Sequence, residues 1–516
     1  MSEYGFWNLA QRNPEHVALI EANGGALRAG ELLAQANRLV HGLRGLGLRQ
    51  GDCVATCLPN GAPMVEVYLA AVQAGLYLTP INNHLTASEI AYILGDCEAK
   101  AFIGAEAFES ACRGAAEQAG LPESARYAVG RVAGFRPLSA LSDGQSATAP
   151  AERSAGQVMN YTSGTTGRPK GVRRPLAPFD PDAVCSMYAM FLGMFGIQPH
   201  ADNVHLCGSP LYHTAVLVFA ASSLHLGHTV VLMDKWTPEL CLQAIERHRV
   251  TTSHMVPTQF HRLLALPETV RARYDVSSLR HMVHAAAPCP IDVKRRMFEW
   301  WGPVIYEYYA ASEGGGTLVT PEEWLRYPGT VGRAWPSSEV RILDDAGAPC
   351  PTGTPGTVYM ALGAADFKYH KDEGKTAANR RDGFFTVGDV GYLNADGYLF
   401  LCDRKIDMII SGGVNIYPSE IEAELLTHPK VADAAVFGIP HDDWGEAVKA
   451  VIEPAPGAVP DAALADEILA FCTERMAKYK CPRSIDFVAA MPRDPNGKLY
   501  KRKLRDPYWA GRQRAI

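Results

Sequence analysis

From the sequence we expect neither a membrane-spanning segment nor a secretory signal. Its most apolar segment, residues 215–226, contains Ser222, Ser223 and His225 and is shorter than the roughly 20 apolar residues that a spanning helix needs. The N-terminal sequence MSEYGFWNLAQRNPE does not place a basic start before an apolar stretch. We therefore expect a cytoplasmic protein with no membrane span.

Paired cysteines are also missing. The 12 cysteines are scattered singly, and none stands in a Cys-x-x-Cys pair. Cys53 and Cys57 lie four residues apart in an apolar run, which is typical of core positions. The pattern excludes a disulfide framework and a zinc site, and it is typical of a reducing compartment.

A basic surplus, which a general nucleic-acid binder would carry, is absent as well. The formal net charge is -6, and 20% of the residues are charged. The one local basic run, residues 498–505 (KLYKRKLR), is typical of a solvated face near a terminus. We therefore expect small-molecule partners and no nucleic acid.

The length and the hydrophobic periodicity predict an α/β fold with several packing units. A chain of 516 residues is too long for one core. Helix-like and strand-like segments alternate over the first 150 residues, with a helix expected over 29–46 and a buried strand over 52–58. This alternation predicts layered sheets that are mainly parallel. Residues 126–153 are rich in Ala, Ser and Gly, and we expect a loop there.

Two further units follow from the pattern of the second half of the chain. Residues 329–401 hold short strands and Gly/Asp turns, which predict a small antiparallel sheet or barrel. From about Asp403, strands and helices alternate over roughly 110 residues, the size of a small α+β domain. The expected fold class is therefore multidomain, combining α/β and α+β parts.

The most informative stretch is residues 161–172, YTSGTTGRPKGV. Its glycines let backbone N–H groups approach an anion closely, its hydroxyls donate hydrogen bonds, and Lys170 adds a mobile positive charge. These residue types predict a loop that grips a polyphosphate. The spacing excludes a P-loop NTPase, because Pro169 stands where the second glycine should be and Gly171 follows the lysine.

Four more motifs follow this loop in order. They are YAASE at 309–313, FFTVGD at 384–389, RKIDMIISGGVNIYPSEIE at 404–422 and PRDPNGK at 492–498. Together the five motifs resemble the signatures of the acyl-adenylate-forming superfamily, which includes acyl-CoA synthetases, peptide-synthetase adenylation domains and firefly-type luciferases. The resemblance covers essentially the whole chain.

The resemblance implies a division into two domains and a hinge. Residues 1–402 would form the N-terminal adenylation domain, which binds ATP and the acid. Residues 403–406, with Asp403 and Ile406, would form the hinge. Residues 407–516 would form a small mobile C-terminal domain that carries the catalytic Lys498. Ile406 departs from the family, which usually has Asp or Lys there, so an apolar hinge would slow or bias the rotation unless Asp407 substitutes for it.

The resemblance also implies how ATP and magnesium are held. Tyr309 would stack on adenine, Ser312 would contact the α-phosphate, and Asp389 and Arg404 would hold the ribose. Oxygen ligands for Mg²⁺ would come from Thr165 and Glu313. The residues expected to hold the phosphates are Thr162, Ser163, Gly164, Thr165, Thr166, Gly167 and Lys170.

Three of the implied site residues have plainer alternatives. Asp389 in a Gly-Asp turn could be a turn residue. Lys498 next to Asn-Gly could be a solvated lysine beside a hairpin. His213 lies either beside the substrate carboxylate, as a catalytic residue together with Glu313 and Lys498, or in the core as a satisfied histidine.

The acyl and CoA sites are expected at glycine- and alanine-rich segments. Gly314–Gly316, with Met187, Met190 and Met194, would leave a roomy apolar acyl pocket. Gly412 and Gly413 would admit the pantetheine arm of CoA, and Trp444 would either stack on the CoA nucleotide or simply pack. The acyl-pocket residues implied by the resemblance are His213, Ala285, Ala286, Ala287, Gly314 and Gly315. Family members usually have glycine where Ala310 stands and a more glycine-rich loop at 284–288.

The expected function is magnesium- and ATP-dependent activation of a carboxylic acid to an acyl-adenylate, followed by thioester formation with CoA. A medium or long fatty acid, or a bulky aromatic or steroid-like acid, is the expected substrate. One alternative is an acyl-AMP ligase that loads a carrier protein. An alternative of another class is a slow acyl-adenylate or acyl-CoA binding protein. A homodimer is compatible with the sequence.

Overall fold

A computed structural model describes residues 3–162, 169–200, 202–311, 314–336, 338–362, 368–493 and 499–511. The chain divides into two compact units. Unit 1 comprises Met1–Met255, Leu266–Val283 and Ala364–Ala378. Unit 2 comprises Val256–Ala265, His284–Gly363 and Asn379–Ile516.

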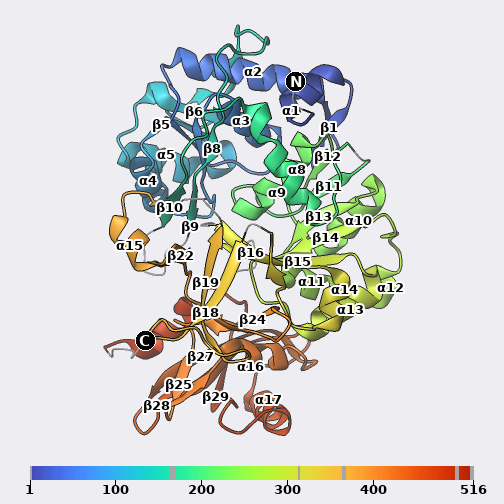
Figure 1. The fold of residues 1–516 in the computed structure, drawn as a ribbon, viewed down its shortest axis with the longest axis vertical. Helices are drawn as coiled ribbons and strands as arrows, with labels where there is room; N and C mark the ends of the chain where they lie inside the picture. Colours follow the sequence, from blue (N-terminus) through green and yellow to red (C-terminus); the bar gives the residue numbers. More distant parts are fainter. Residues whose placement is uncertain are drawn as a thin grey trace. The chain divides into compact units, whose positions relative to one another are not determined.

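The first sheet of unit 1 is six-stranded and parallel, in the order β7-β6-β5-β3-β4-β8 (Figure 1). Its strands are β3 (Cys53–Thr56), β4 (Tyr77–Pro80), β5 (Ala99–Ala105), β6 (Arg126–Val129), β7 (Arg136–Pro137) and β8 (Gln157–Val158). The helices between and before them are α2 (Ala29–Gly45), α3 (Ala62–Gln73), α4 (Ala87–Asp96), α5 (Glu109–Gln118) and α6 (Ser139–Ser142).

Both faces of this sheet are buried, because successive side chains of a strand point to opposite faces. Val54 of β3 and Leu78 of β4 belong to one apolar cluster with residues of α2 and α3. Their neighbours Cys53 and Tyr77 belong to a second cluster with residues of α4 and α5. The sheet therefore lies between two helical layers, as continuous apolar strands predict.

Helix α4 begins at a pair of reciprocal cap hydrogen bonds. Thr86 caps α4, and its backbone N–H donates to Glu89 Oε2 at 2.8 Å while its hydroxyl accepts from Glu89 N at 3.4 Å. This is the capping box that Thr86 and Glu89 indicate. The expected helix over 29–46 is α2, and the expected strand over 52–58 is β3.

The second sheet of unit 1 includes β1 (Val17–Ile20), β2 (Ala26–Arg28), β11 (Val204–Cys207), β12 (Thr229–Leu232), β13 (Thr252–Met255) and β14 (His281–His284). Parallel pairing joins β13, β11, β12 and β1, and β2 closes the edge antiparallel to β1. Its helices include α1 (Phe6–Arg12), α7 (Pro181–Val184), α8 (Ser186–Gly193), α9 (Thr214–His225), α10 (Pro238–His248) and α12 (Glu268–Arg271).

A small antiparallel sheet, β20-β10-β9, completes unit 1. Its strands are β9 (Asn160–Thr162), β10 (Lys170–Arg173) and β20 (Lys368–Tyr369), and α15 (Glu373–Ala378) follows.

Unit 2 begins with antiparallel strands β15 (Ile305–Ala311), β16 (Gly314–Val319) and β17 (Arg333–Ala334). Its helices in this region are α11 (Pro257–Leu264), α13 (Ile291–Trp301) and α14 (Pro321–Arg326). A separate antiparallel sheet contains β18 (Ser338–Leu343), β19 (Gly356–Leu362), β21 (Arg380–Arg381), β22 (Phe384–Phe385), β23 (Asp389–Leu393) and β24 (Leu399–Arg404). This sheet confirms the antiparallel region expected within 329–401.

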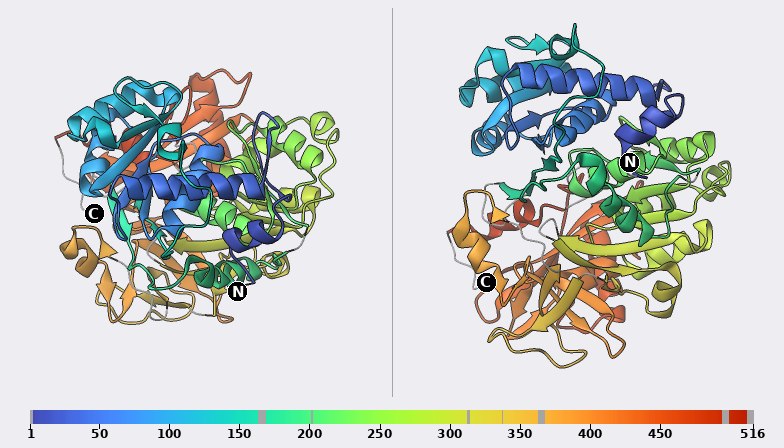
Figure 2. Two further views of the ribbon diagram at one scale, coloured as in Figure 1. Left: turned by 90° about the horizontal axis from the view of Figure 1, so that it is seen from above. Right: turned by 45° about the horizontal axis from the view of Figure 1, so that its top comes forward.

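The C-terminal part of unit 2 is an α+β arrangement, drawn in orange and red in Figures 1 and 2. Its sheet contains β25 (Ile409–Ser411), β26 (Val414–Ile416), β27 (Val431–His441), β28 (Gly445–Pro454) and β29 (Ser484–Phe487). Its helices are α16 (Pro418–Leu425), α17 (Ala462–Arg475) and α18 (Lys501–Arg505). Ile421, Leu425 and Ile468 pack against this sheet in one core.

The predicted multidomain fold class is confirmed, whereas the boundaries at residues 402 and 407 stay a prediction. The expected loop over 126–153 is wrong, because β6, β7 and α6 lie within it. Tyr127 and Ala128 of β6 are 1% and 2% exposed. Sheet pairing and burial decided the strand conformation, and a composition without periodicity does not reveal either. Among the described residues, no helix is long and apolar enough to cross a membrane.

Two glycines of α2 provide a matched test of this packing. A Cβ on buried Gly42 would overlap the carbonyl oxygen of Leu141, whereas a Cβ on Gly45 would meet nothing within 4 Å. We expect Gly42→Ala to lower the free energy of unfolding by about 2 kcal/mol through overpacking. Gly45→Ala should raise it by about 0.5 kcal/mol. Denaturant unfolding measures both, and equal effects would contradict the described packing of α2 on α6.

Candidate active site

The ends of the expected phosphate loop form an antiparallel hairpin in unit 1. Thr162, the last residue of β9, pairs with Lys170, the first residue of β10. The Lys170 ammonium forms an ion pair with Asp372. The hydroxyl of Tyr161 donates to Asp96 Oδ2 at 2.5 Å, and burial together with this bond raises the pKa of Tyr161 well above its usual value. The hairpin therefore presents Lys170 beside the loop. Ser163, Gly164, Thr165, Thr166 and Gly167 lie outside the described residues.

Three of the expected nucleotide-binding residues meet in unit 2. The hydroxyl of Tyr309 on β15 donates to Asp389 Oδ2 at 2.7 Å. Arg404 Nε lies 3.5 Å from Asp389 Oδ1. Asp389 and Arg404 are register partners on β23 and β24. Three motifs that are up to 95 residues apart in sequence (309 to 404) therefore contribute to one polar cluster.

Exposure within this cluster differs from one side chain to the next. Asp389 is 9% exposed as a residue, whereas the Arg404 side chain is 45% exposed. Asp389 is therefore held in place by its neighbours, while Arg404 remains accessible to a ligand. Ser312 and Glu313, which follow Tyr309 in the same motif, lie outside the described residues.

The expected acyl residues come from both units. His213, the residue before α9, is half-buried in unit 1, with its ring 4.4 Å from that of Tyr212. Ala285, Ala286 and Ala287 follow β14 in unit 2. A pocket shared by His213 and the alanines stays a prediction.

Ala286 has a left-handed backbone, with φ of 74°. A residue with a Cβ is strained in this region, and glycine is not. This is the loop where the family usually has more glycine. The chain therefore stores strain beside the expected acyl and adenine sites, a place where strained residues are often found.

Within the run Gly314–Gly316, Gly315 and Gly316 have close neighbours, and the expected roomy acyl pocket there stays a prediction. A Cβ on Gly315 would lie 3.0 Å from Met360 Cβ. A Cβ on Gly316 would lie 2.7 Å from Trp335 Cη2 and 2.6 Å from the carbonyl oxygen of Tyr309. The glycines therefore admit neighbouring groups at close range instead of leaving space.

Two of the methionines expected at the acyl pocket are surface residues of unit 1. Met187 and Met190 on α8 are 59% and 69% exposed. Helical spacing alone predicted that they share a face, but it does not specify whether that face is covered. The core contacts of this segment come from Leu192, Phe195 and Ile197 instead.

The expected CoA residues lie in the C-terminal part of unit 2. Gly412 and Gly413, with φ of 58° and 78°, form the two-residue turn between β25 and β26. Positive φ at both positions is the geometry of a tight hairpin that favours glycine. The Trp444 ring stacks on His441, with centroids 4.6 Å apart, and the Arg483 guanidinium lies 3.6 Å from its centroid. These contacts favour packing as the role of Trp444, and stacking on a CoA base stays a prediction.

The expected hinge segment makes hydrogen bonds with two helices that follow it in sequence, α16 and α18. Asp403 Oδ2 accepts from Ser419 N at 2.8 Å. Arg505 Nη1 lies 3.4 Å from both the carbonyl oxygen of Ile406 and Asp407 Oδ1. Asp407 thus supplies a polar contact beside the apolar Ile406. Lys498 lies outside the described residues, and its role stays a prediction.

Two features near these residues were missed by the sequence analysis. One is Trp335, which packs on Gly316. The other is a buried cluster of Lys294, Glu307 and His284 in unit 2. Lys294 falls three, four and seven residues before Met297, Phe298 and Trp301, which are all buried. That periodicity indicates the inward face of α13 and would have identified the lysine.

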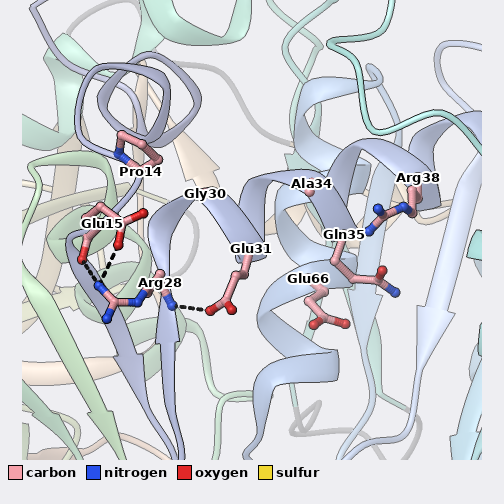
Figure 3. Close-up of a pocket in the computed structure, with 9 residues that line it drawn as sticks. All are labelled: Pro14, Glu15, Arg28, Gly30, Glu31, Ala34, Gln35, Arg38 and Glu66. Carbon is pink, nitrogen blue, oxygen red and sulfur yellow. Dashed lines mark hydrogen bonds and ion pairs between the residues drawn. The ribbon is translucent and has the colours of Figure 1, made fainter.

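A groove of about 660 Å³ lies elsewhere in unit 1 (Figure 3). Figure 3 shows the Arg28 guanidinium turned toward Glu15, with which its charge is paired. The backbone N–H of Arg28 donates to Glu31 Oε2 at 2.8 Å. None of the motif residues that the structure describes lines this groove. Its lining is Pro14, Glu15, Arg28, Gly30, Glu31, Ala34, Gln35, Arg38 and Glu66. It is therefore not the site that the motifs indicate.

Among the described residues, no group of three or more His, Cys, Asp or Glu side chains could hold a metal ion. Magnesium on a nucleotide needs only one or two protein carboxylates, because phosphates and waters complete its shell. The expected ligands, Thr165 and Glu313, lie outside the described residues, so magnesium binding stays a prediction.

The strain at Ala286 gives a matched stability test. Ala286 and Ala265 are both exposed, but Ala265 has a right-handed backbone with φ of -73°. We expect Ala286→Gly to raise the free energy of unfolding by about 0.5 kcal/mol, because relief of strain outweighs the added chain entropy. Ala265→Gly should lower it by about 0.5–1 kcal/mol. Thermal unfolding measures both changes. If Ala286→Gly lowers the free energy of unfolding as much as Ala265→Gly does, the inferred strain at Ala286 is contradicted.

Comparisons with known proteins agree with the motifs. The family described as AMP-binding enzyme matches residues 6–364, and the AMP-binding enzyme C-terminal domain matches residues 420–498. A feruloyl-CoA synthase of Amycolatopsis sp. is 33% identical over 97% of this chain and 98% of that protein. A long-chain-fatty-acid–CoA ligase of Mycobacterium tuberculosis is 30% identical over 98% of each chain.

Similarity extends to solved structures. The anthranilate CoA ligase AuaEII, in complex with anthranoyl-AMP, superposes with a TM-score of 0.85 at 27% identity. The match covers 98% of this chain and 97% of that one. The predicted superfamily and enzyme class are thereby confirmed. The chain belongs to the AMP-binding enzyme family, and it is an AMP-forming acyl-CoA ligase of the acyl-adenylate-forming superfamily.

Proposed function

We propose that this ligase activates an aromatic carboxylic acid. The acid's carboxylate attacks the α-phosphorus of ATP, an oxygen–phosphorus bond forms, and pyrophosphate leaves. The thiolate of CoA then attacks the carbonyl carbon of the adenylate, a thioester forms, and AMP leaves. Both steps bring an anion to a negatively charged partner, so positioning and positive charge supply most of the rate.

The polar cluster of Tyr309, Asp389 and Arg404 supports nucleotide binding in unit 2. A carboxylate accepts hydrogen bonds from a ribose diol, and the same device occurs in dinucleotide folds. Asp389 already accepts from the Tyr309 hydroxyl, which fixes its orientation. Arg404 is accessible enough to contact the nucleotide. The ring of Tyr309 is then the surface on which adenine stacks.

The phosphates are assigned to the loop between β9 and β10. Lys170 at the start of β10 supplies a supporting charge, and its ion pair with Asp372 holds it beside the loop. Thr165 and Glu313 are the proposed ligands of magnesium, which would neutralise phosphate charge. Lys498 is proposed to contact the carboxylate and α-phosphate oxygens as charge builds on them.

The contact between Trp335 and Gly316 is the observation that carries the choice of an aromatic acid. The indole occupies the space beside Gly316 that a side chain would fill, next to Tyr309 and Ala310. Trp335 is itself half-buried, so part of its flat surface remains available. A planar acid gains stacking on such a surface, worth about 0.5–1.5 kcal/mol beyond area burial, whereas a long alkyl chain needs an open path.

The similar proteins include more enzymes named for aromatic acids than for fatty acids among those compared above, which supports an aromatic substrate. They include enzymes for ferulate and anthranilate, and one for long-chain fatty acids. The close neighbours of Gly315 and Gly316 and the exposure of Met187 and Met190 support an aromatic acid over a long chain. A homodimer and a cytoplasmic location stay predictions.

The proposal is tested with the full-length protein by acid-dependent exchange of labelled pyrophosphate into ATP. The panel holds ferulate, anthranilate, benzoate and fatty acids of increasing chain length. We expect exchange with aromatic acids, and thioester and AMP when CoA is added. If no acid in the panel supports exchange, the result favours a binding protein instead of an enzyme. If exchange occurs but no thioester forms with CoA, the result favours transfer to a carrier protein. Lys498→Ala is the control, because it should abolish exchange.

Trp335→Ala tests the assigned substrate class. Removing the indole should lower kcat/KM for the preferred aromatic acid roughly 10-fold and raise it for aliphatic acids, in line with pocket substitutions worth about 1–3 kcal/mol. Trp335→Phe retains an aromatic surface and should keep most of the preference. Steady-state AMP release across the panel measures both. An unchanged ratio of aromatic to aliphatic kcat/KM in Trp335→Ala would contradict the assignment.

A further inference from the structure

Three buried polar side chains of unit 2 belong to none of the five motifs. Lys294 and His284 are 0% exposed, and Glu307 is 5% exposed. The Lys294 ammonium donates to Glu307 Oε2 at 2.6 Å. His284 Nε2 lies 3.3 Å from the same oxygen. Both nitrogen atoms therefore lie within 3.3 Å of one carboxylate oxygen, which accepts the hydrogen bond of Lys294.

The cluster is a closed ion pair with a neutral imidazole beside it. Burial acts to raise the pKa of Glu307, but the nearby Lys294 and His284 outweigh it and lower that pKa to about 2. Burial lowers the pKa of His284, which favours the uncharged ring. The Lys294 ammonium also lies 4.9 Å from the ring centroid of Trp324. The charges are satisfied within the cluster, so a role in direct contact with a substrate is not indicated.

Stability alone does not explain why such a pair is kept. Taking two charges out of water is costly, and apolar side chains of similar volume often serve the folded state equally well. Unlike an apolar contact, an ion pair fixes the relative position of its two side chains, because its hydrogen bond has a preferred distance and angle. A buried pair next to a site is therefore suited to fixing the position of its neighbours.

The neighbours in this case are two segments of the candidate active site. His284 immediately precedes the loop Ala285–Ala287, whose central residue Ala286 is strained. Glu307 stands two residues before Tyr309 on β15, so the two side chains leave the strand on the same side. Strained residues persist only where their surroundings over-determine them. The cluster provides that restraint from both strands.

We propose that Lys294, Glu307 and His284 are positioning residues for the nucleotide site. They hold the strained loop and the strand that carries Tyr309 in the geometry that ATP requires. The inference rests on the proposed function only in assigning ATP to Tyr309. Its test therefore includes ATP binding, which does not require that the acid be known.

The central variant replaces both charges by apolar side chains of similar size, Lys294→Met with Glu307→Met. Because no unpaired charge remains buried, the double variant should fold with a Tm close to that of wild type, unlike either single variant. We expect the Kd of the double variant for ATP, measured by equilibrium dialysis, to rise. We also expect its kcat for exchange with the preferred acid to fall, and the product of the two changes to be roughly 10- to 100-fold. A purely structural role would leave both unchanged once the Tm is restored.

A matched control and a milder variant complete the experiment. Lys449, 5% exposed and paired with Asp486 at 2.7 Å, is a buried lysine in the C-terminal sheet. Lys449→Met should leave the Kd for ATP and the exchange rate unchanged. Glu307→Gln keeps the volume of the side chain and an oxygen that accepts from Lys294. This variant should therefore fold even if the double variant does not, and it should lose less ATP affinity.

The outcomes separate the inference from the proposed function. Wild-type ATP affinity and exchange in every folded variant of the cluster would overturn the positioning role. The same loss of ATP affinity in Lys449→Met would overturn it too, because the effect would then not be specific to the cluster. Weaker ATP binding in the double variant, together with no exchange by wild type for any acid, would support the inference and reject the proposed function.

Discussion

The contact of Asp389 with Tyr309 and Arg404 is the constraint on which the proposed nucleotide site of unit 2 depends. The three side chains belong to β15, β23 and β24, and the bond at 2.7 Å and the ion pair at 3.5 Å require these strands to keep their register. A slip by one residue would turn Asp389 to the other face of its sheet. The pairing of Asp389 with Arg404 in the ladder therefore has a chemical consequence as well as a structural one.

Near this contact, close packing holds residues in conformations or environments that would be unfavourable without their neighbours. Ala286 has a left-handed backbone, and Gly315 and Gly316 have neighbours closer than a side chain would permit. A buried ion pair joins Lys294 of α13 to Glu307 of β15. Each feature costs free energy locally, and each restricts where the loop and β15 can lie. Preorganisation of this kind suits a reaction between two anions, where little barrier lowering is available except through position and charge.

Much of the fold could be predicted because its signals are local. The helix expected over 29–46 is α2, and the buried strand expected over 52–58 is β3. The strand β6 was missed, because pairing with β5 decided its conformation. The exposure of Met187 on α8 was missed for a related reason. Periodicity defines a face, and only the surrounding elements decide whether it is buried.

The sequence by itself determined the reaction class, the order of the motifs and the residue types at each step. These depend on contiguous segments, such as the glycine and threonine loop that ends at Lys170, whose chemistry can be read without knowing distant neighbours. Only the tertiary structure decided that Glu307 meets Lys294 and that Trp335 covers Gly316. Those pairs join separate elements, and their energies depend on burial and distance. The first set of facts supports an acyl-adenylate, and the second decides how its site is held and shaped.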